Sequence, residues 1–291
     1  MSSHRSLTSR AAAFVLFAVA AVASAQGKVH LKIATTADAM DAFSNWTNAT
    51  SWQNISTFKN GNASRPVVDL VLQLQALRAG GLDFDFELVR ALTYDLAKNE
   101  VVAGNTDLSA ESIWSPEIEA NAASVSETEP VLAKGEFVKG LYGLPTNPVL
   151  MKLTGPADFK NLTVAVVSTW EFDQKTIQTL GVKAVVKVAT PELAYAAIQK
   201  GKADCMLDEF SANPDLHIVR GGVRLVPVPG YKVALVASRS YIVSKKATDA
   251  DAVLKALSSG LKELKANGTV SRAYTESGFF NPNVTNWKLL N

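Results

Sequence analysis

Residues 158–209 alternate short runs of β-branched residues with segments of helical period. Apolar runs at 162–168, 182–189 and 203–207 predict three strands. The helical patterns between them end at Gly181 and Gly201, a residue type that tolerates the left-handed conformation of a helix C-terminus. Thr190 and Pro191 are typical of a helix start. This order predicts a parallel sheet with right-handed crossovers, and such sheets bind ligands at the carboxyl ends of their strands.

Two polar corners follow these strands and are candidates for a binding site. The first corner contains Thr169, Trp170 and Glu171, and the second contains Asp208 and Glu209. Thr169 is either a plain helix cap or a ligand contact, and one residue can serve both roles. Glu209 is either an exposed carboxylate at a strand end or a partner for a positively charged ligand group.

The N-terminal half carries the same alternation less regularly. A strand is predicted at 30–35, helices at 66–79 and 93–104, and strands at 82–88 and 107–114. Glu111, Ser112 and Trp114 close the last strand and join the candidate site. Residues 37–65 show no period, and such a long irregular loop is either functional or wrongly assigned. Its Trp46 and Trp52 either line a ligand site or pack on their own lobe.

The C-terminal half predicts strands around 219–226 and 231–243 and helices at 248–266 and 270–276. Glycines and prolines between residues 130 and 148, with Pro227 and Pro229, indicate two chain crossings. We therefore expect an α/β protein of two lobes, each a mostly parallel sheet flanked by helices. Residues 26–133 and 228–291 would form lobe 1, and residues 134–227 would form lobe 2.

Several of these features resemble one protein family. The strand at 162–168, the Ser168-Thr169 corner and Gly201-Lys202 before an acidic strand end are similar to the second lobe of type II periplasmic solute-binding proteins, most closely the family-3, amino-acid type. Residues 241–278 resemble the return of that family to its first lobe. The resemblance implies a two-lobed fold that captures a small molecule and delivers it to an ABC-type membrane transporter. The acidic position that pairs the ligand's ammonium in that family falls on Glu209.

One expected ligand contact of that family is missing. A Ser/Thr-Pro-Glu-Arg turn supplies an arginine that clamps the ligand's carboxylate there, as guanidinium geometry favours. Ser115-Pro116-Glu117 matches this turn, but Ile118 stands at the arginine position, and residues 91–219 contain no arginine. The tryptophans beside Glu111, Glu171 and Glu209 instead favour a cationic or weakly polar solute, because aromatic faces and carboxylates both attract ammonium groups.

Residues 1–25 have the pattern of a cleaved secretory signal, with Arg5 and Arg10 before an apolar run and a small-residue cleavage site. The whole chain has 29 basic and 27 acidic residues, so loss of these two arginines leaves a formally neutral protein. The sequence contains no stripe of lysines and arginines, so nucleic acid is not an expected partner. Cys205 is the single cysteine, so an internal disulfide is excluded. No cysteine directly follows the signal, so we do not expect a lipid anchor of the bacterial kind. We expect a periplasmic or secreted monomer.

Other functions remain open at the level of sequence. A sensor or accessory protein would use the same fold, and an enzyme of dehydratase type could use Glu111, Glu171, Asp208 and Glu209 as acid and base. The sequence shows no catalytic motif, metal-ligand spacing or phosphate loop, so no cofactor or metal is predicted. Asn-x-Ser/Thr sequons are surface glycosylation signals in a eukaryotic secreted protein and plain loop chemistry in a bacterium. They occur at Asn45, Asn48, Asn54, Asn62, Asn161, Asn267 and Asn283.

Overall fold

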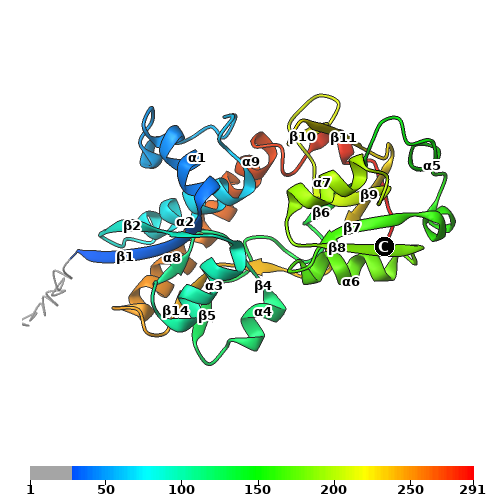
Figure 1. Cartoon of the computed structure of the whole chain (residues 1–291). Coiled ribbons are helices and arrows are strands. Elements are labelled where there is room, and N and C mark those ends of the chain that lie inside the picture. Colours follow the sequence, from blue (N-terminus) through cyan, green and yellow to red (C-terminus); the bar gives the residue numbers. More distant parts are fainter. Residues whose placement is uncertain (1–27) are drawn as a thin grey trace, which may run out of the picture.

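The computed structural model describes residues 28–291, and the expected signal sequence lies outside them. The described chain forms two α/β lobes, each built around its own sheet (Figure 1). This confirms the expected two-lobed α/β architecture. No helix within residues 28–291 is both long and apolar enough to cross a membrane.

The sheet of the first lobe has the strand order β2-β1-β3-β14-β5. Strands β1 (Val29–Thr36), β2 (Phe84–Ala91) and β3 (Leu108–Ser109) run parallel, so their carboxyl ends meet at one edge. Strand β14 (Ile242–Ser244) is antiparallel to both β3 and β5 (Val125–Glu127). The helices of this lobe are α1 (Ala37–Thr47), α2 (Arg65–Ala79), α3 (Tyr94–Ala103), α8 (Ala250–Ala266) and α9 (Thr269–Glu276).

Helices α2 and α8 approach closely because each has a glycine at the contact. A Cβ on Gly260 would lie 1.8 Å from the carbonyl oxygen of Ala76, and a Cβ on Gly80 would lie 1.9 Å from that of Ala256. Helix α2 is therefore almost completely buried in the core of lobe 1. This burial fixes the position of its first residue, Arg65.

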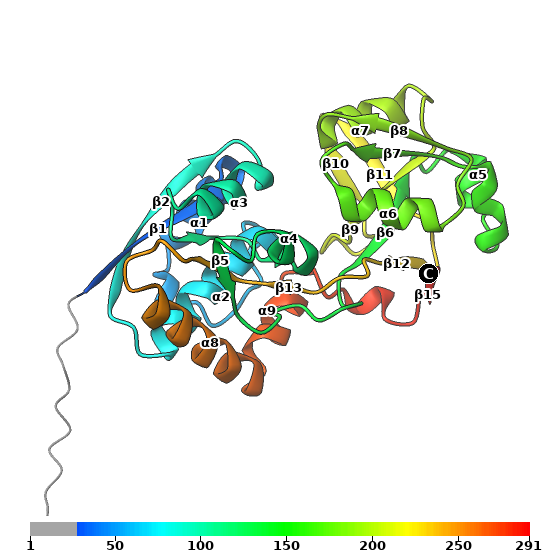
Figure 2. The ribbon, with the colours of Figure 1, turned by 90° about the horizontal axis from the view of Figure 1, so that it is seen from below.

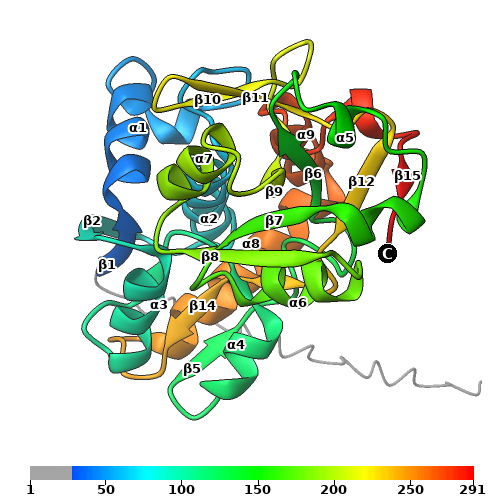
Figure 3. The same ribbon diagram turned by 45° about the vertical axis from the view of Figure 1, so that its right-hand side comes forward.

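The sheet of the second lobe has the order β10-β11-β6-β9-β7-β8. Strands β7 (Thr163–Val167), β8 (Ala184–Val188) and β9 (Cys205–Glu209) are parallel, as predicted. The chain moves from β7 out to β8 and back across to β9, so α6 (Glu171–Thr179) and α7 (Pro191–Gln199) cover opposite faces (Figure 3). The rest of this lobe comprises β6 (Val138–Gly143), α5 (Pro148–Met151), β10 (Ile218–Arg220) and β11 (Val223–Pro227).

Two further strands near the C-terminus extend the second sheet. Strand β12 (Tyr231–Ala234) pairs with β6, and β15 (Lys288–Leu289) pairs with β12. The expected division had assigned residues 228–291 as a whole to lobe 1, whereas these two strands join the sheet of lobe 2. For the remaining residues the division stays a prediction.

The segments that connect the lobes lie side by side (Figure 2). Strand β4 (Ile113–Trp114) pairs with β13 (Arg239–Ser240) in a separate two-stranded sheet, and α4 (Ser115–Ala120) follows β4. The strand expected at 107–114 is thus split into β3 and β4 by a bend at residues 110–112. This bend takes the chain out of the first sheet and brings Trp114 to the space between the lobes.

Of the two alternatives for residues 37–65, wrong assignment as a loop holds for the first part, because α1 occupies Ala37–Thr47. Ala39, Phe43 and Trp46 are its buried residues, at the i, i+4 and i+7 spacing of one helix face. Short polar residues around them had obscured this period. The segment after α1 contains only a single 3-10 turn at Trp52–Asn54 before α2 begins.

Candidate functional site

A cavity of about 570 Å³ lies between the two lobes. Lobe 1 contributes Thr36 at the end of β1, Asp38 in the first turn of α1, Arg65 at the start of α2 and Trp114 at the end of β4. Lobe 2 contributes the start of α6 and the end of β9. The cavity therefore lies at the carboxyl ends of parallel strands of both lobes, where sheets of this type bind ligands.

The structure brings most of the predicted site residues to this cavity. Seven of them line it, namely Glu111, Trp114, Thr169, Trp170, Glu171, Asp208 and Glu209. Thr169 does not cap α6, because the N-cap residue is Trp170 and no side chain accepts a hydrogen bond from the first turn. Of its two expected roles, Thr169 therefore keeps only a place in the cavity wall.

Trp46, Trp52 and Ser112 do not line the cavity. Trp46 is buried in the core of lobe 1, edge-on to Phe58 at 5.9 Å. Trp52 packs on the ring of Phe84 at 5.8 Å, at the outer part of the same lobe. Both tryptophans follow the packing alternative, because the helix α1 and the turn after it bury their apolar faces against their own sheet.

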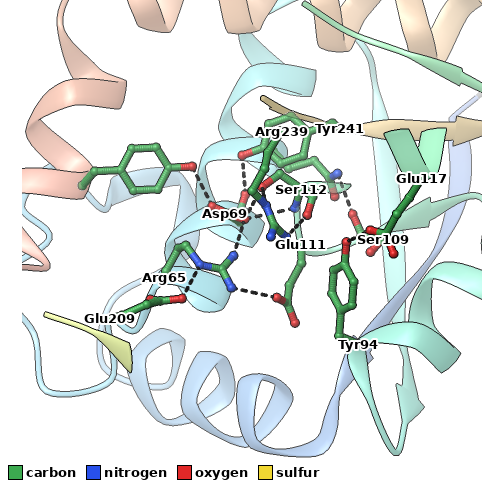
Figure 4. Close-up of polar contacts among 12 residues, drawn as sticks. Arg65, Asp69, Tyr94, Ser109, Glu111, Ser112, Glu117, Glu209, Arg239 and Tyr241 are labelled. Carbon is green, nitrogen blue, oxygen red and sulfur yellow. Dashed lines mark hydrogen bonds and ion pairs between the residues drawn. The ribbon is translucent and has the colours of Figure 1, made fainter. Parts of the chain in front are cut away.

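Ser112 is buried directly behind the cavity wall and holds two charged residues in place. Its backbone N–H and its hydroxyl both donate to Asp69 Oδ2, at 3.0 and 2.8 Å. Arg239 Nε donates to the Ser112 hydroxyl at 3.0 Å. Tyr274 donates to the other Asp69 oxygen at 2.6 Å, and Tyr241 donates to the Asp69 carbonyl at 2.8 Å. Figure 4 shows this network in close-up.

Arg65 is the central charge of the site and was missed from the sequence. It donates from Nη1 to Asp69 at 3.1 Å, from Nη2 to Glu111 at 3.2 Å and from Nε to Glu209 at 3.0 Å. Its guanidinium also lies over the Phe137 ring, 5.4 Å from the centroid. The Ser64-Arg65-Pro66 sequence predicts only a helix start. No neighbouring residue in the sequence indicates that the arginine faces three carboxylates.

Arg239 is the second arginine that sequence reasoning missed. It lines the cavity from β13, and its guanidinium lies over the Trp114 ring, 4.4 Å from the centroid. Position 118 has no arginine, but three arginines line the cavity from other elements, namely Arg65, Arg220 and Arg239. Ile118 itself is buried in a small core cluster.

Lys139 and Asp173 form a buried ion pair on the lobe 2 wall. The Lys139 Nζ lies 2.7 Å from Asp173 Oδ1, and both side chains are almost inaccessible. The ammonium also lies 4.6 Å from the centroid of the Trp170 ring. Both partners belong to lobe 2, so this pair does not depend on lobe closure.

Burial and neighbouring charges shift the acid–base behaviour of the cavity carboxylates in different directions. Burial raises the pKa of Glu111, although the charges of Arg65 and Arg239 oppose it. Burial likewise raises the pKa of Asp208, against the charges of Lys139 and Arg220. For Glu209 burial also acts upward, but the charges of Arg65 and Lys139 outweigh it and lower the pKa. Of these three carboxylates, Glu209 is the one whose charged form is favoured by its surroundings.

The structure is similar to solved two-lobed binding proteins. A mutant of ArgBP from T. maritima matches with a TM-score of 0.53 and 18% identity, over 85% of this chain and 94% of that chain. A periplasmic His/Glu/Gln/Arg/opine family-binding protein from Silicibacter pomeroyi, in complex with lysine, matches with a TM-score of 0.53 and 19% identity, over 87% of this chain and 98% of that chain. The fold is that of type II solute-binding proteins.

Another similar structure is the ancestral amino-acid-binding protein AncCDT-1, a precursor of cyclohexadienyl dehydratase. It matches with a TM-score of 0.50 and 16% identity, over 87% of this chain and 95% of that chain. At such low identities the similarity establishes the fold alone. The sequence matches no protein-family model and no curated protein.

Proposed function

We propose that this protein is an exported receptor that captures a small solute between its two lobes and delivers it to an ABC-type membrane transporter. The observation that carries the proposal is the cavity of about 570 Å³, whose wall comes from both lobes. Its volume falls within the range of small-molecule sites. A solute held by both walls stabilises the closed arrangement, which is how hinged two-lobed receptors respond to a ligand.

The charges of the cavity wall favour a cationic solute. The wall carries the carboxylates of Asp38, Glu111, Glu117, Glu171, Asp173, Asp208 and Glu209 against the basic groups of Arg65, Lys139, Arg220 and Arg239. Arg65 uses one oxygen of Glu111 and one of Glu209, so each carboxylate keeps a second oxygen as an acceptor. An acidic surplus with free acceptor oxygens suits an ammonium or guanidinium group.

A ligand that also carries a carboxylate is the second candidate, favoured by the arginines that line the wall, Arg65, Arg220 and Arg239. The prediction of a cationic or weakly polar solute rested on the lack of a clamping arginine at position 118, and it did not take account of arginines that reach the wall from other elements. Arg65, however, is already engaged by three carboxylates. Arg239 donates to Ser112 and packs on Trp114, so it offers only its remaining N–H groups to a ligand carboxylate.

A thermal-shift screen of amines, amino acids and carboxylates tests this proposal, because a ligand that binds only the folded form raises the melting temperature. We expect stabilisation by monocationic amines or guanidines, and its loss in the double variant Asp208→Asn, Glu209→Gln. Glu263→Gln, at an exposed position of α8, is the matched control and should keep the shift. Stabilisation by dicarboxylates alone would overturn the cationic assignment.

Delivery to a transporter is the finer part of the proposal. Export is inferred from residues 1–25, and each lobe exposes a leucine near residues of the cavity wall, Leu92 in lobe 1 and Leu193 in lobe 2. Leu92 follows β2 at the edge where β1 leads into the cavity, and Leu193 lies next to Pro191 of the wall. Crosslinking of the solute-bound protein to membranes of its host should capture a transporter permease. Capture of a receptor that carries no transport domain would indicate the sensor alternative.

An enzyme on this fold is the remaining alternative, supported by one observation. Glu111, Asp173 and Asp208 lie in the cavity wall with raised pKa values caused by burial, and such groups occur at catalytic sites. Incubation of the protein with any solute that stabilises it, followed by mass spectrometry of the solute, separates the two functions. An unchanged solute supports the receptor, and loss of water from the solute supports the dehydratase-type enzyme.

A further inference from the structure

The Arg65–Glu209 ion pair joins the two lobes directly. Arg65 begins α2 in lobe 1, and Glu209 ends β9 in lobe 2, with 3.0 Å between Nε and Oε1. Every other ion pair recorded within residues 28–291 joins residues of the same lobe. Among the ion pairs, this pair alone joins the two lobes, and it lies beside the stack of Trp114 on Phe172. Uncharged contacts add to it, because Asn281, after α9, donates from Nδ2 to the Ser211 carbonyl of lobe 2 at 2.7 Å.

The lobe 1 side of this pair is held rigidly. The two terminal nitrogens of Arg65 donate to Asp69 and Glu111, which are themselves buried, and only Nε points to lobe 2. The arginine is 9% exposed and rests on the Phe137 ring. Opening of the lobes would break the bond to Glu209 and leave the bonds within lobe 1 intact. Arg65 is thus positioned for Glu209 before the lobes close.

The charges around Arg65 explain why its position matters. Without this guanidinium, Asp69 and Glu111 on one wall would face Glu209 on the other as like charges at short range. A cation between the walls removes that repulsion, and Arg65 is a cation that the protein supplies itself. Its donors occupy the place that a solute cation would need between Glu111 and Glu209.

We propose that Arg65 is a built-in cation that closes the two lobes on each other without a bound solute. A solute cation then binds by replacing the Arg65 nitrogen at Glu209, while Arg65 stays bonded to Asp69. This second step deepens the proposed function and rests on it, whereas closure by Arg65 itself requires no solute. This replacement would make the cavity selective among solute cations, because each must compete with the tethered guanidinium of Arg65 for the carboxylate of Glu209.

The distance between the lobes in solute-free protein tests the closure. Spin labels are placed at Asn45→Cys on α1 and Lys187→Cys on β8, two exposed positions on opposite lobes, while the native Cys205 is fully buried and stays unlabelled. Dialysed protein should show mainly the short distance of the closed form. Glu209→Gln should raise the ratio of open to closed molecules roughly tenfold or more, because a charge-assisted bond between the lobes is lost.

Arg90→Gln is the matched control, since it removes an arginine that pairs with Asp41 within lobe 1. It should leave the distance distribution unchanged. An equal distribution in wild-type protein and Glu209→Gln would overturn the proposal. Because no solute is present, that result would leave the receptor function untouched.

Chemical rescue identifies the cation position. Arg65→Ala should open the lobes, and millimolar guanidinium should restore the short distance, while tetramethylammonium, which donates no hydrogen bond, should not. Opening without any response to guanidinium would contradict a cation position between Glu111 and Glu209. If Arg65→Ala does not fold, because Asp69 and Glu111 lose their partner, Glu209→Gln decides the question alone.

Discussion

Trp114 of lobe 1 stacks on Phe172 of lobe 2 across the cavity, with ring centroids 4.8 Å apart and ring planes inclined by 29°. The guanidinium of Arg239 also lies over the Trp114 ring, 4.4 Å from its centroid. One aromatic stack and one ion pair thus bridge the cavity between the lobes, and these two contacts should respond differently to substitution.

Removal of the Phe172 ring should loosen closure without unfolding either lobe. An aromatic pair contributes about 0.5–1.5 kcal/mol beyond its buried area. Phe172→Ala should therefore increase the radius of gyration measured by small-angle X-ray scattering on solute-free protein. Phe172→Tyr keeps the stack and serves as the control. An unchanged radius in Phe172→Ala would show that the stack does not hold the lobes together.

The close contact of α2 with α8 should be sensitive to a single methyl group. Gly260→Ala places a Cβ against the Ala76 carbonyl, so the helices must separate, at a cost of about 1–3 kcal/mol in the free energy of unfolding. Urea denaturation measures this loss. Gly61→Ala, with no atom within 4 Å of the added Cβ, should be close to neutral. Equal stability of the two variants would contradict the close contact of α2 with α8.

Asp69 should contribute strongly to the free energy of unfolding, because it is a buried carboxylate with several hydrogen-bond partners. It accepts hydrogen bonds from Ser112, Tyr274 and Arg65 in the core of lobe 1. Asp69→Asn leaves Arg65 with one fewer anion and turns an acceptor into a donor. We expect a loss of about 3–5 kcal/mol in the free energy of unfolding. Asp95→Asn, at a partly exposed pair with Lys98, should cost well under half of that.

Glu111 should give the stability of lobe 1 a particular pH dependence. Burial raises its pKa above the ordinary value of 4.5. The folded protein therefore binds a proton that the unfolded chain releases, and stability from this group declines as pH rises between 4.5 and the raised value. Glu111→Gln should remove that decline in a series of urea titrations from acidic to neutral pH.

Glu119→Gln, an exposed position on α4, is the control for this series and should follow the wild-type profile. The opposite slope is expected for Glu209, whose pKa is lowered, because its contribution is present above 4.5 and is lost as pH falls through the lower folded value. A Glu111→Gln profile parallel to wild type would mean that the carboxylate ionises freely.

The sequence determined the second lobe well. Its strands are contiguous β-branched runs, and its helices carry their own start and end signals. The Thr190 hydroxyl accepts from the Leu193 N–H at 3.3 Å, and Gly181 and Gly201 adopt φ values of +65° and +67°. These signals are local, so no distant contact was needed to recognise them. Glu209 and Trp114 reached the predicted site for the same reason, since each closes a strand whose end the pattern marks.

Only the tertiary structure decided which charges meet in the cavity. Arg65 lies 144 residues from Glu209 along the chain, and Arg239 lies 127 residues from Ser112. No periodicity or cap relates residues so far apart, because their proximity depends on the bend after β3, the glycine contact of α2 with α8 and the closure of the lobes. Long-range packing also places Trp46 and Trp52 against the core of lobe 1 and away from the cavity wall. Local sequence specifies the elements, whereas the electrostatics of the site arise from long-range packing that orders them in space.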